Sequence, residues 1–190
     1  MGTRVDAGSF SFDQKKRIEE IKARTAEIRA DWEANYKGKP DDRPRLLVTG
    51  CPNAGVRDKV IKAVEEMGAD VVVFDTCSGI RNNLELVDET EADVYLALAK
   101  KYINTNCSVM SPNGGRREGI SWMVDEFHVD GVIEVILQSC HTYDVEAYYI
   151  KNYVTQEKHI PYMGIETDYS MSDKGQINTR LQAFLETIDK

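Results

Sequence analysis

Short apolar runs alternate along most of the chain with longer segments in which apolar residues recur every three to four positions. The run at residues 132–137 is apolar at every position except Glu134, so it predicts a strand buried on both faces. Such strands in alternation with helices are typical of a parallel sheet covered on both sides. We therefore predict an α/β fold with a doubly wound, four-stranded parallel sheet in the order 2-1-3-4. The predicted strands are residues 45–49, 69–74, 131–137 and 161–165, and the predicted helices between and after them are residues 56–67, 91–103, 116–127, 144–155 and 174–188.

The beginning of the chain has a different pattern. A stripe of apolar and small residues recurs at helical spacing among many charges, and Ser11 with Gln14 forms a capping box, which together predict one amphipathic helix. This stripe should lie against the domain or a partner, and residues 38–44 are typical of a linker. We expect a helix and linker over residues 1–44 and an α/β domain over residues 45–190. The stripe consists of Ile18, Ile21, Thr25, Ile28 and Trp32.

Composition narrows the function classes. A chain of 190 residues has room for one compact domain with an appendage, and a net charge of −8 without a basic stripe argues against nucleic-acid binding. No run of about 18 apolar residues is present, so we expect no membrane span. The N-terminus lacks the apolar core of a signal peptide, which predicts a cytoplasmic protein. Four cysteines without small-scaffold spacing fit a reducing compartment better than a disulfide framework.

Three of the cysteines, Cys51, Cys77 and Cys140, each follow a predicted strand. Ligands and substrates of parallel α/β sheets gather beyond the carboxyl ends of the strands, so this edge is the candidate site. Cys140 also precedes a helix, whose N-terminus favours thiolate over thiol. Such a sulfur can ligate a metal cluster or act as a nucleophile, and the alternative is a buried cysteine that packs as a small hydrophobe.

Other residues at these strand ends are candidates for binding, although each can also be a structural or surface residue. His141 points away from Cys140 if the backbone is extended, which favours a nearby hydrogen-bond donor or a surface histidine over a catalytic dyad. Residues 50–55, GCPNAG, lack the Lys-Ser/Thr pair of a phosphate loop. Cys107 lies in an irregular segment and is expected to be structural. The candidates for binding an anionic ligand or a partner are Arg81, Arg116 and Arg117, and the candidates after the fourth strand are Glu166, Asp168 and Tyr169.

Four motifs together resemble the C-terminal domain of the 2-hydroxyacyl-CoA dehydratase and benzoyl-CoA reductase family. Their order and spacing agree from about residue 45 to the end of the chain. They are DTCSGIR at residues 75–81, GVI followed by QSCHTY at residues 131–143, IETDYS at residues 165–170 and GQINTR at residues 175–180.

The resemblance implies a cytoplasmic, oxygen-sensitive lyase of anaerobic metabolism built from two related subunits, each with a [4Fe–4S] cluster. A separate ATP-dependent iron–sulfur activator supplies an electron, and dehydratase members use it to form a ketyl radical from a 2-hydroxyacyl-CoA. Cys140 then corresponds to a cluster ligand, with His141 and Tyr143 tuning the cluster by hydrogen bonds. Arg81, Arg116 and Arg117 become candidate contacts to the acyl-CoA. Glu166, Asp168 and Tyr169 become candidates for positioning the partner domain or the substrate.

The chain also departs from the family pattern. A family subunit has a preceding domain that supplies most cluster cysteines, and residues 1–44 contain none. Either Cys51 and Cys77 join Cys140 in holding the cluster, or the chain is a half that works beside another polypeptide and lacks a cluster alone. A benzoyl-CoA reductase-type subunit, a non-catalytic α/β binding module and a hydrolase with Cys140 as nucleophile are the alternative functions.

Overall fold

The structure, a computed structural model, describes residues 12–39, 41–51, 56–77, 79–110 and 112–188. The chain forms two compact units, Met1–Asp42 and Arg43–Lys190, and each is described by itself. Most of the segment 50–55, in which the sequence resembles a phosphate loop, lies outside the described residues.

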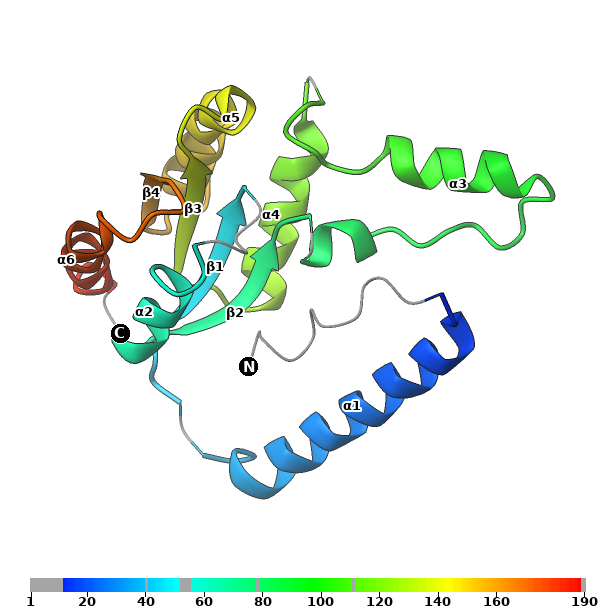
Figure 1. Ribbon diagram of the computed structural model, residues 1–190, viewed down its shortest axis with the longest axis horizontal. Coiled ribbons are helices and arrows are strands. Elements are labelled where there is room, and N and C mark those ends of the chain that lie inside the picture. The colour runs from blue at the N-terminus through cyan, green and yellow to red at the C-terminus, as the bar shows by residue number, and fades with distance from the viewer. Residues whose placement is uncertain (1–11, 40, 52–55, 78, 111, 189–190) are drawn as a thin grey trace. The chain divides into compact units, whose positions relative to one another are not determined.

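The second unit is built on a parallel sheet whose four strands are hydrogen-bonded in the order β2-β1-β3-β4, which confirms the predicted fold class and strand order. Every strand runs in the same direction, so all carboxyl ends meet at one edge (Figure 1). The strands are β1 (Arg45–Gly50), β2 (Asp70–Asp75), β3 (Gly131–Leu137) and β4 (Tyr162–Thr167).

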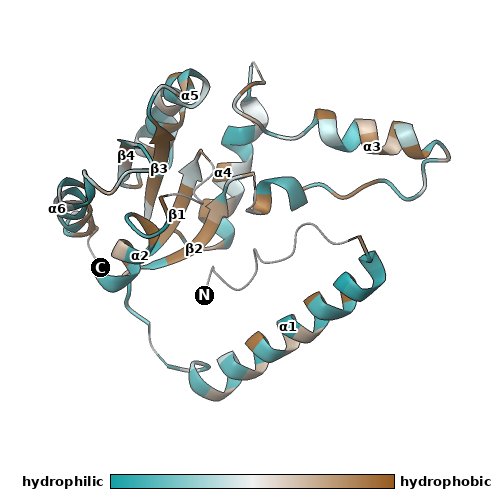
Figure 2. Cartoon of the chain, viewed as in Figure 1, coloured by the Kyte–Doolittle hydropathy of each residue, from teal (hydrophilic) through white to brown (hydrophobic). Residues whose placement is uncertain are grey.

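Helices cover both faces of this sheet, as the apolar strands require. On one face, Leu46, Val48 and Ile133 of the strands pack in a core with Val64 of α2 (Ile61–Glu66) and Leu181 of α6 (Lys174–Leu185). On the other face, Leu47 and Val132 pack with Ile120 of α4 (Gly114–Glu126) and Ile150 of α5 (His141–Asn152). Figure 2 shows β3, one of the two inner strands, as a strongly hydrophobic strand.

The helices differ from the predicted ranges mainly at their ends. The helix expected over residues 56–67 is regular only in α2, because the backbone N–H groups of Lys59, Val60 and Lys62 bond to carbonyls three, four and five residues back. α5 begins at His141 rather than at residue 144 and continues into a π-helical turn, η3 (Tyr153–Glu157). A 3₁₀ turn, η2 (Ile80–Asn83), and the helix α3 (Val94–Ile103) lie between β2 and α4.

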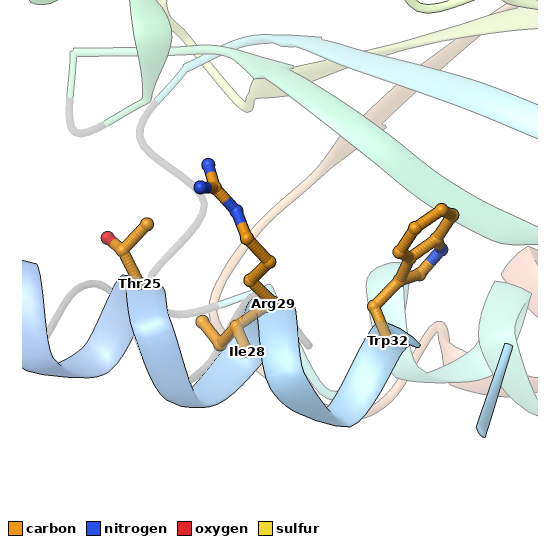
Figure 3. Close-up of a pocket in the computed structure, with 4 residues that line it drawn as sticks. All are labelled: Thr25, Ile28, Arg29 and Trp32. Atoms are coloured by element: carbon orange, nitrogen blue, oxygen red, sulfur yellow. The ribbon is translucent and has the colours of Figure 1, made fainter. Parts of the chain in front are cut away.

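The first unit contains the long helix α1 (Gln14–Asn35). Its N-cap is Asp13, whose side chain accepts a hydrogen bond from the Lys16 N–H, and not Ser11, which lies outside the described residues. None of the residues Gln14–Asn35 is buried, and Figure 3 shows side chains that line a shallow hollow along this helix, Trp32 among them. That the apolar stripe lies against the domain or a partner stays a prediction.

Candidate functional site

The carboxyl edge of the sheet carries three cysteines, one after each of the strands β2, β1 and β3. Gly50 has a φ of 109°, and a Cβ there would lie 2.1 Å from the Val135 carbonyl oxygen, so only glycine allows β1 to end this close to β3. The next residue, Cys51, donates its N–H to the same carbonyl at 2.8 Å. The tight pairing of β1 and β3 therefore brings Cys51 to the edge at which Cys140 follows β3.

Cys140 stands on a short, well-bonded junction between β3 and α5. Its N–H donates to the Leu137 carbonyl at 2.9 Å, and its own carbonyl accepts from Asp144 N–H as the N-cap of α5. Ser139 just before it has a φ of 68°, an uncommon value for a residue with a side chain. The turn thus fixes the position of Cys140 at the helix N-terminus, as the sequence suggested.

The thiols of Cys51 and Cys140 interact, but their surroundings differ. Burial raises the pKa of Cys51 to about 11, although the Leu137 N–H donates to its sulfur at 3.3 Å. Cys140 is only partly exposed, and this burial opposes ionisation. The Tyr143 N–H, the Thr142 hydroxyl and the Cys51 thiol outweigh it and lower the pKa of Cys140 below its ordinary value. Cys140 is therefore the more readily ionised thiol of this pair.

The remaining cysteines and His141 lie around this pair at different depths. Cys77 is exposed and close enough to affect the Tyr143 phenol electrostatically, whereas Cys107 is partly buried. His141 is an exposed first residue of α5. Across the described residues, no group of three or more His, Cys, Asp or Glu side chains is arranged to hold a metal ion.

Beneath the cysteines lies a largely buried network of charged and hydroxyl side chains, which we call the arginine network: Thr49, Asp75, Arg81, Arg116, Glu134, Tyr143, Glu146 and Tyr162. Arg81 donates from Nε and Nη2 to the two carboxylate oxygens of Asp75, at 2.9 and 2.8 Å. Arg116 donates to Glu134 at 2.8 Å and also reaches Asp75 and Glu146. Arg81 and Arg116 therefore bind carboxylates of the chain itself, and as contacts to an acyl-CoA they stay a prediction that this geometry does not favour.

The arginine network holds its members in defined charge states. Burial alone would raise the pKa of Asp75, but hydrogen bonds from Arg81 and the charges of both arginines lower it. Burial raises the pKa of Glu134, although Arg116 and the Tyr162 hydroxyl donate to it. Three carboxylates thus face two guanidinium groups. Of Asp75 and Glu134, Glu134 is the more readily protonated.

Tyr143 links the arginine network to the cysteine edge. It is buried, its hydroxyl accepts from Arg81 Nη1 at 2.8 Å, and the guanidinium groups of Arg81 and Arg116 lie 5.9 and 5.2 Å from its ring centroid. Because Glu146 and Tyr143 both belong to α5, the two arginines attach the first turns of that helix to the sheet. The position of Cys140 therefore depends on side chains that lie beneath it.

The candidates at the far end of the sheet and on α4 are exposed. Glu166, Asp168 and Tyr169 follow or end β4 at the surface, and Arg117 places its guanidinium 5.3 Å from the Tyr153 ring centroid. Their roles toward a substrate or a partner domain stay predictions.

A buried lysine that sequence reasoning missed fixes the loop after β4. Lys59 is fully buried, and its Nζ donates to the Ser170 carbonyl at 2.6 Å and to Asp173 Oδ1 at 2.7 Å. Thr167 Oγ1 donates to the other oxygen of Asp173 at 2.5 Å. Nothing in the helical pattern of residues 56–67 marks Lys59 as buried, whereas Glu134, a charge within an apolar strand, is a readable sign of a buried partner.

The chain is similar to known dehydratase proteins over nearly its whole length. A family profile described as “2-hydroxyglutaryl-CoA dehydratase, D-component” matches residues 3–188. The match therefore includes the N-terminal helix, whereas the resemblance recognised in the sequence begins only near residue 45. Among the described residues, no helix is both long and apolar enough to cross a lipid bilayer.

Two curated relatives match nearly the whole chain. A protein of Escherichia coli (strain K12) named “Putative dehydratase subunit YjiM” is 48% identical over 184 residues, which are 97% of this chain and 47% of that protein. A protein of Clostridium sporogenes named “(R)-phenyllactyl-CoA dehydratase beta subunit” is 27% identical over 185 residues, again 97% of this chain and 47% of that protein. The chain thus spans about half the length of these relatives.

Proposed function

The chain belongs to the 2-hydroxyglutaryl-CoA dehydratase D-component family, and from this membership we propose that it forms one half of an iron–sulfur subunit of a 2-hydroxyacyl-CoA dehydratase-like enzyme. The proposed reaction is the reductively activated, radical dehydration of a 2-hydroxyacyl-CoA. The proposed partners are a polypeptide equivalent to the rest of the relatives, a homologous second subunit and an ATP-dependent iron–sulfur activator. Both relatives carry dehydratase names, which favours this branch over the benzoyl-CoA reductase branch.

The observation that carries the proposal is Cys140 itself. It lies at the carboxyl edge of the sheet, on a junction fixed by β3 and α5, and hydrogen bonds from the Tyr143 N–H and the Thr142 hydroxyl lower its pKa and so favour the thiolate that iron binds. A thiolate on a rigid mount is what an iron ligand requires. Cys140 is therefore the residue that we assign to the cluster.

The other residues at this edge fit a complete [4Fe–4S] cluster only in part. Cys51 is buried with a raised pKa, Cys77 is exposed on the far side of β1, and the described residues contain no ready-made metal group. A four-iron cluster needs about four ligands, so most of them would come from another polypeptide. The length of the relatives supports this division, since this chain matches 47% of each.

When bound, such a cluster would supply one-electron transfer at low potential. The chain's own contribution is to hold Cys140 in place and to supply hydrogen-bond donors near it. Arg81 occupies an acceptor position of the Tyr143 hydroxyl, which leaves the Tyr143 proton free to donate toward the cysteine edge. His141 is exposed beside Cys140 and is proposed to donate a hydrogen bond there.

A hydrolase with Cys140 as nucleophile would need a base in contact with the sulfur. The side-chain neighbours that lower the pKa of Cys140 are Thr142 and Cys51, and His141 is not among the hydrogen-bond partners described for this thiol. Within the part of the chain that the structure describes, no general base is in contact with the Cys140 sulfur to support this alternative.

Iron loading tests the proposal. The chain is produced alone and together with the part of the Escherichia coli relative that lies outside the match, and both samples are reconstituted anaerobically with iron and sulfide. We expect about four iron atoms per complex and a visible thiolate-to-iron absorption band in the joint sample, and neither with Cys140→Ser. Cys107→Ser is the matched control and should retain its iron. Equal iron in the Cys140→Ser complex would refute the assignment and favour a non-catalytic binding module.

A further inference from the structure

α3 exposes its apolar side to solvent. Of its ten residues, Val94–Ile103, only Ala97 is buried, while Tyr95 is 86% and Ile103 is 68% exposed. Figure 1 shows this helix set apart from the sheet and from the helices that cover it. Tyrosines and aliphatic residues on one exposed helix are typical of an interaction surface.

The arrangement around the helix axis makes this exposure directional. With 3.6 residues per turn, Tyr95, Leu98 and Tyr102 lie on one side, and Ala97 lies about 160° from Tyr95. Both lysines of the helix, Lys100 and Lys101, flank Ala97. The helix therefore turns Ala97 inward and leaves an uncharged apolar arc on its other side, in which Leu98 is partly buried and the remaining residues are exposed: Val94, Tyr95, Leu96, Ala99, Tyr102 and Ile103.

Because its apolar residues face solvent, α3 gains little stability from packing against the rest of its unit. A ten-residue helix is marginal in water unless packing supports it. The contacts described for α3 are local: its N-cap Asp93 accepts from the Tyr95 and Leu96 N–H groups, and Lys100 pairs with Glu91 at 2.6 Å. An open cleft of about 640 Å³ adjoins the helix at its C-terminal end, lined by residues that include Lys101, Asn104 and Trp122. Helix and cleft together form a surface that the other described residues of the second unit leave uncovered.

We propose that the apolar arc of α3 docks onto the polypeptide equivalent to the other half of the relatives, a proposal that rests on the division of the subunit proposed above. The chain accounts for 47% of each relative, so a second half of similar size accompanies it there. An arc without charges fits a permanent, apolar interface between halves of one subunit better than a transient encounter steered by charge.

Binding measurements with matched tyrosine variants test the docking surface. The full 190-residue chain is co-produced with the unmatched part of the Escherichia coli relative, and affinity is measured for wild type, Tyr95→Ser/Tyr102→Ser and the control Tyr148→Ser/Tyr149→Ser. The control removes two exposed tyrosines from α5. We expect the α3 variant to bind about ten-fold more weakly or worse and the control to stay within about two-fold of wild type. Equal binding by the α3 variant, or no complex with wild type, overturns the proposal.

Photo-crosslinking identifies what covers the arc. A benzoylphenylalanine in place of Tyr102 should crosslink to the other half, and one in place of Tyr149 should not. Crosslinking of Tyr102 to a second copy of this chain overturns the proposal. Iron is counted separately in the wild-type complex. A stable complex that takes up no iron contradicts the proposed cluster but not the docking surface. Iron uptake together with unimpaired binding of the α3 variant contradicts the docking surface but not the cluster.

Discussion

Arg116 of α4 donates from Nη2 to Oε1 of Glu134 in β3 at 2.8 Å, and both side chains are fully buried. The same guanidinium group donates to Thr49 Oγ1 and contacts Asp75 and Glu146. One side chain thus joins β1, β2 and β3 to α5, the helix that begins after Cys140. The arginine network therefore holds α5, and with it Cys140, against the sheet.

Arg116→Met should destabilise the protein by about 3–5 kcal/mol, because it leaves Glu134 and Asp75 without one of their cationic partners in the interior. The free energy of unfolding is measured in urea. Arg117→Met is the control, since Arg117 is the exposed neighbour on the same helix, and it should change stability by less than about 0.5 kcal/mol. Equal losses for both variants would mean that the buried ion pairs contribute nothing specific.

Acid should destabilise the fold partly through Asp75. Burial opposes ionisation of this carboxyl, but Arg81, Arg116 and Thr49 lower its pKa in the folded state below the unfolded value of about 3.9. Between the two values the unfolded chain binds a proton that the folded chain does not. The stabilisation of the folded state by ionised Asp75 is complete above about pH 4 and is lost as pH falls through the pKa of Asp75 in the folded state. Asp75→Asn should be less stable at pH 7 and should show a shallower decline of unfolding free energy below pH 4.

Glu134 should act in the opposite direction. Burial raises its pKa in the folded state above the unfolded value of about 4.3 despite Arg116 and Tyr162. The folded chain therefore keeps a proton that the unfolded chain has lost, and this contribution is full below about pH 4 and declines as pH rises through the folded pKa. Glu134→Gln should remove that decline when unfolding free energy is followed upward from pH 4. An unchanged slope would show that Arg116 keeps Glu134 ionised throughout.

The sheet could be predicted because its strands are apolar on both faces and are separated by helical periods. β3 was predicted at its observed bounds, and the strand order follows from right-handed crossovers. The beginning of α5 was placed three residues late, because Cys140 is an N-cap without the usual side-chain cap and leaves no capping signature in the sequence. The N-cap position that the sequence pattern did not reveal is thus the one that Cys140 occupies.

The sequence predicted the cysteines of the candidate site but not the buried ion pairs beneath them. Cysteines that follow strands can be read from the sequence, but the partners of Arg81 and Arg116 come from β2, β3 and α5 and depend on how the elements pack. Sequence reasoning therefore assigned these arginines to an anionic ligand, whereas the fold supplies the carboxylates internally. Buried charge pairs across long sequence separations have no local pattern.

Cys140 should react with iodoacetamide faster than Cys51 at pH 8, because only thiolates react and the pKa of Cys51 is raised to about 11. The pKa of Cys140 is lowered from its ordinary value, the Thr142 hydroxyl contributing, so Thr142→Val should shift the pH midpoint of Cys140 labelling upward. Peptide mass spectrometry after timed alkylation measures both sites. Thr155→Val, on the last turn after α5, is the control and should leave the midpoint in place. Preferential labelling of Cys51 would contradict the conclusion that Cys140 has the lower pKa of the two thiols.

Lys59→Met should release the loop after β4. Lys59 is fully buried and holds the Ser170 carbonyl and Asp173 with its ammonium group, so its loss removes two charge-assisted hydrogen bonds. We expect a destabilisation of about 2 kcal/mol and faster hydrogen exchange across residues 168–173, with smaller changes in β1 and β3. Lys62→Met is the control, because Lys62 pairs with Glu66 at 3.7 Å on the exposed side of α2 and should change stability by less than about 0.5 kcal/mol. If exchange in residues 168–173 stays at the wild-type rate while the protein is destabilised, Lys59 supports the core and does not fix this loop.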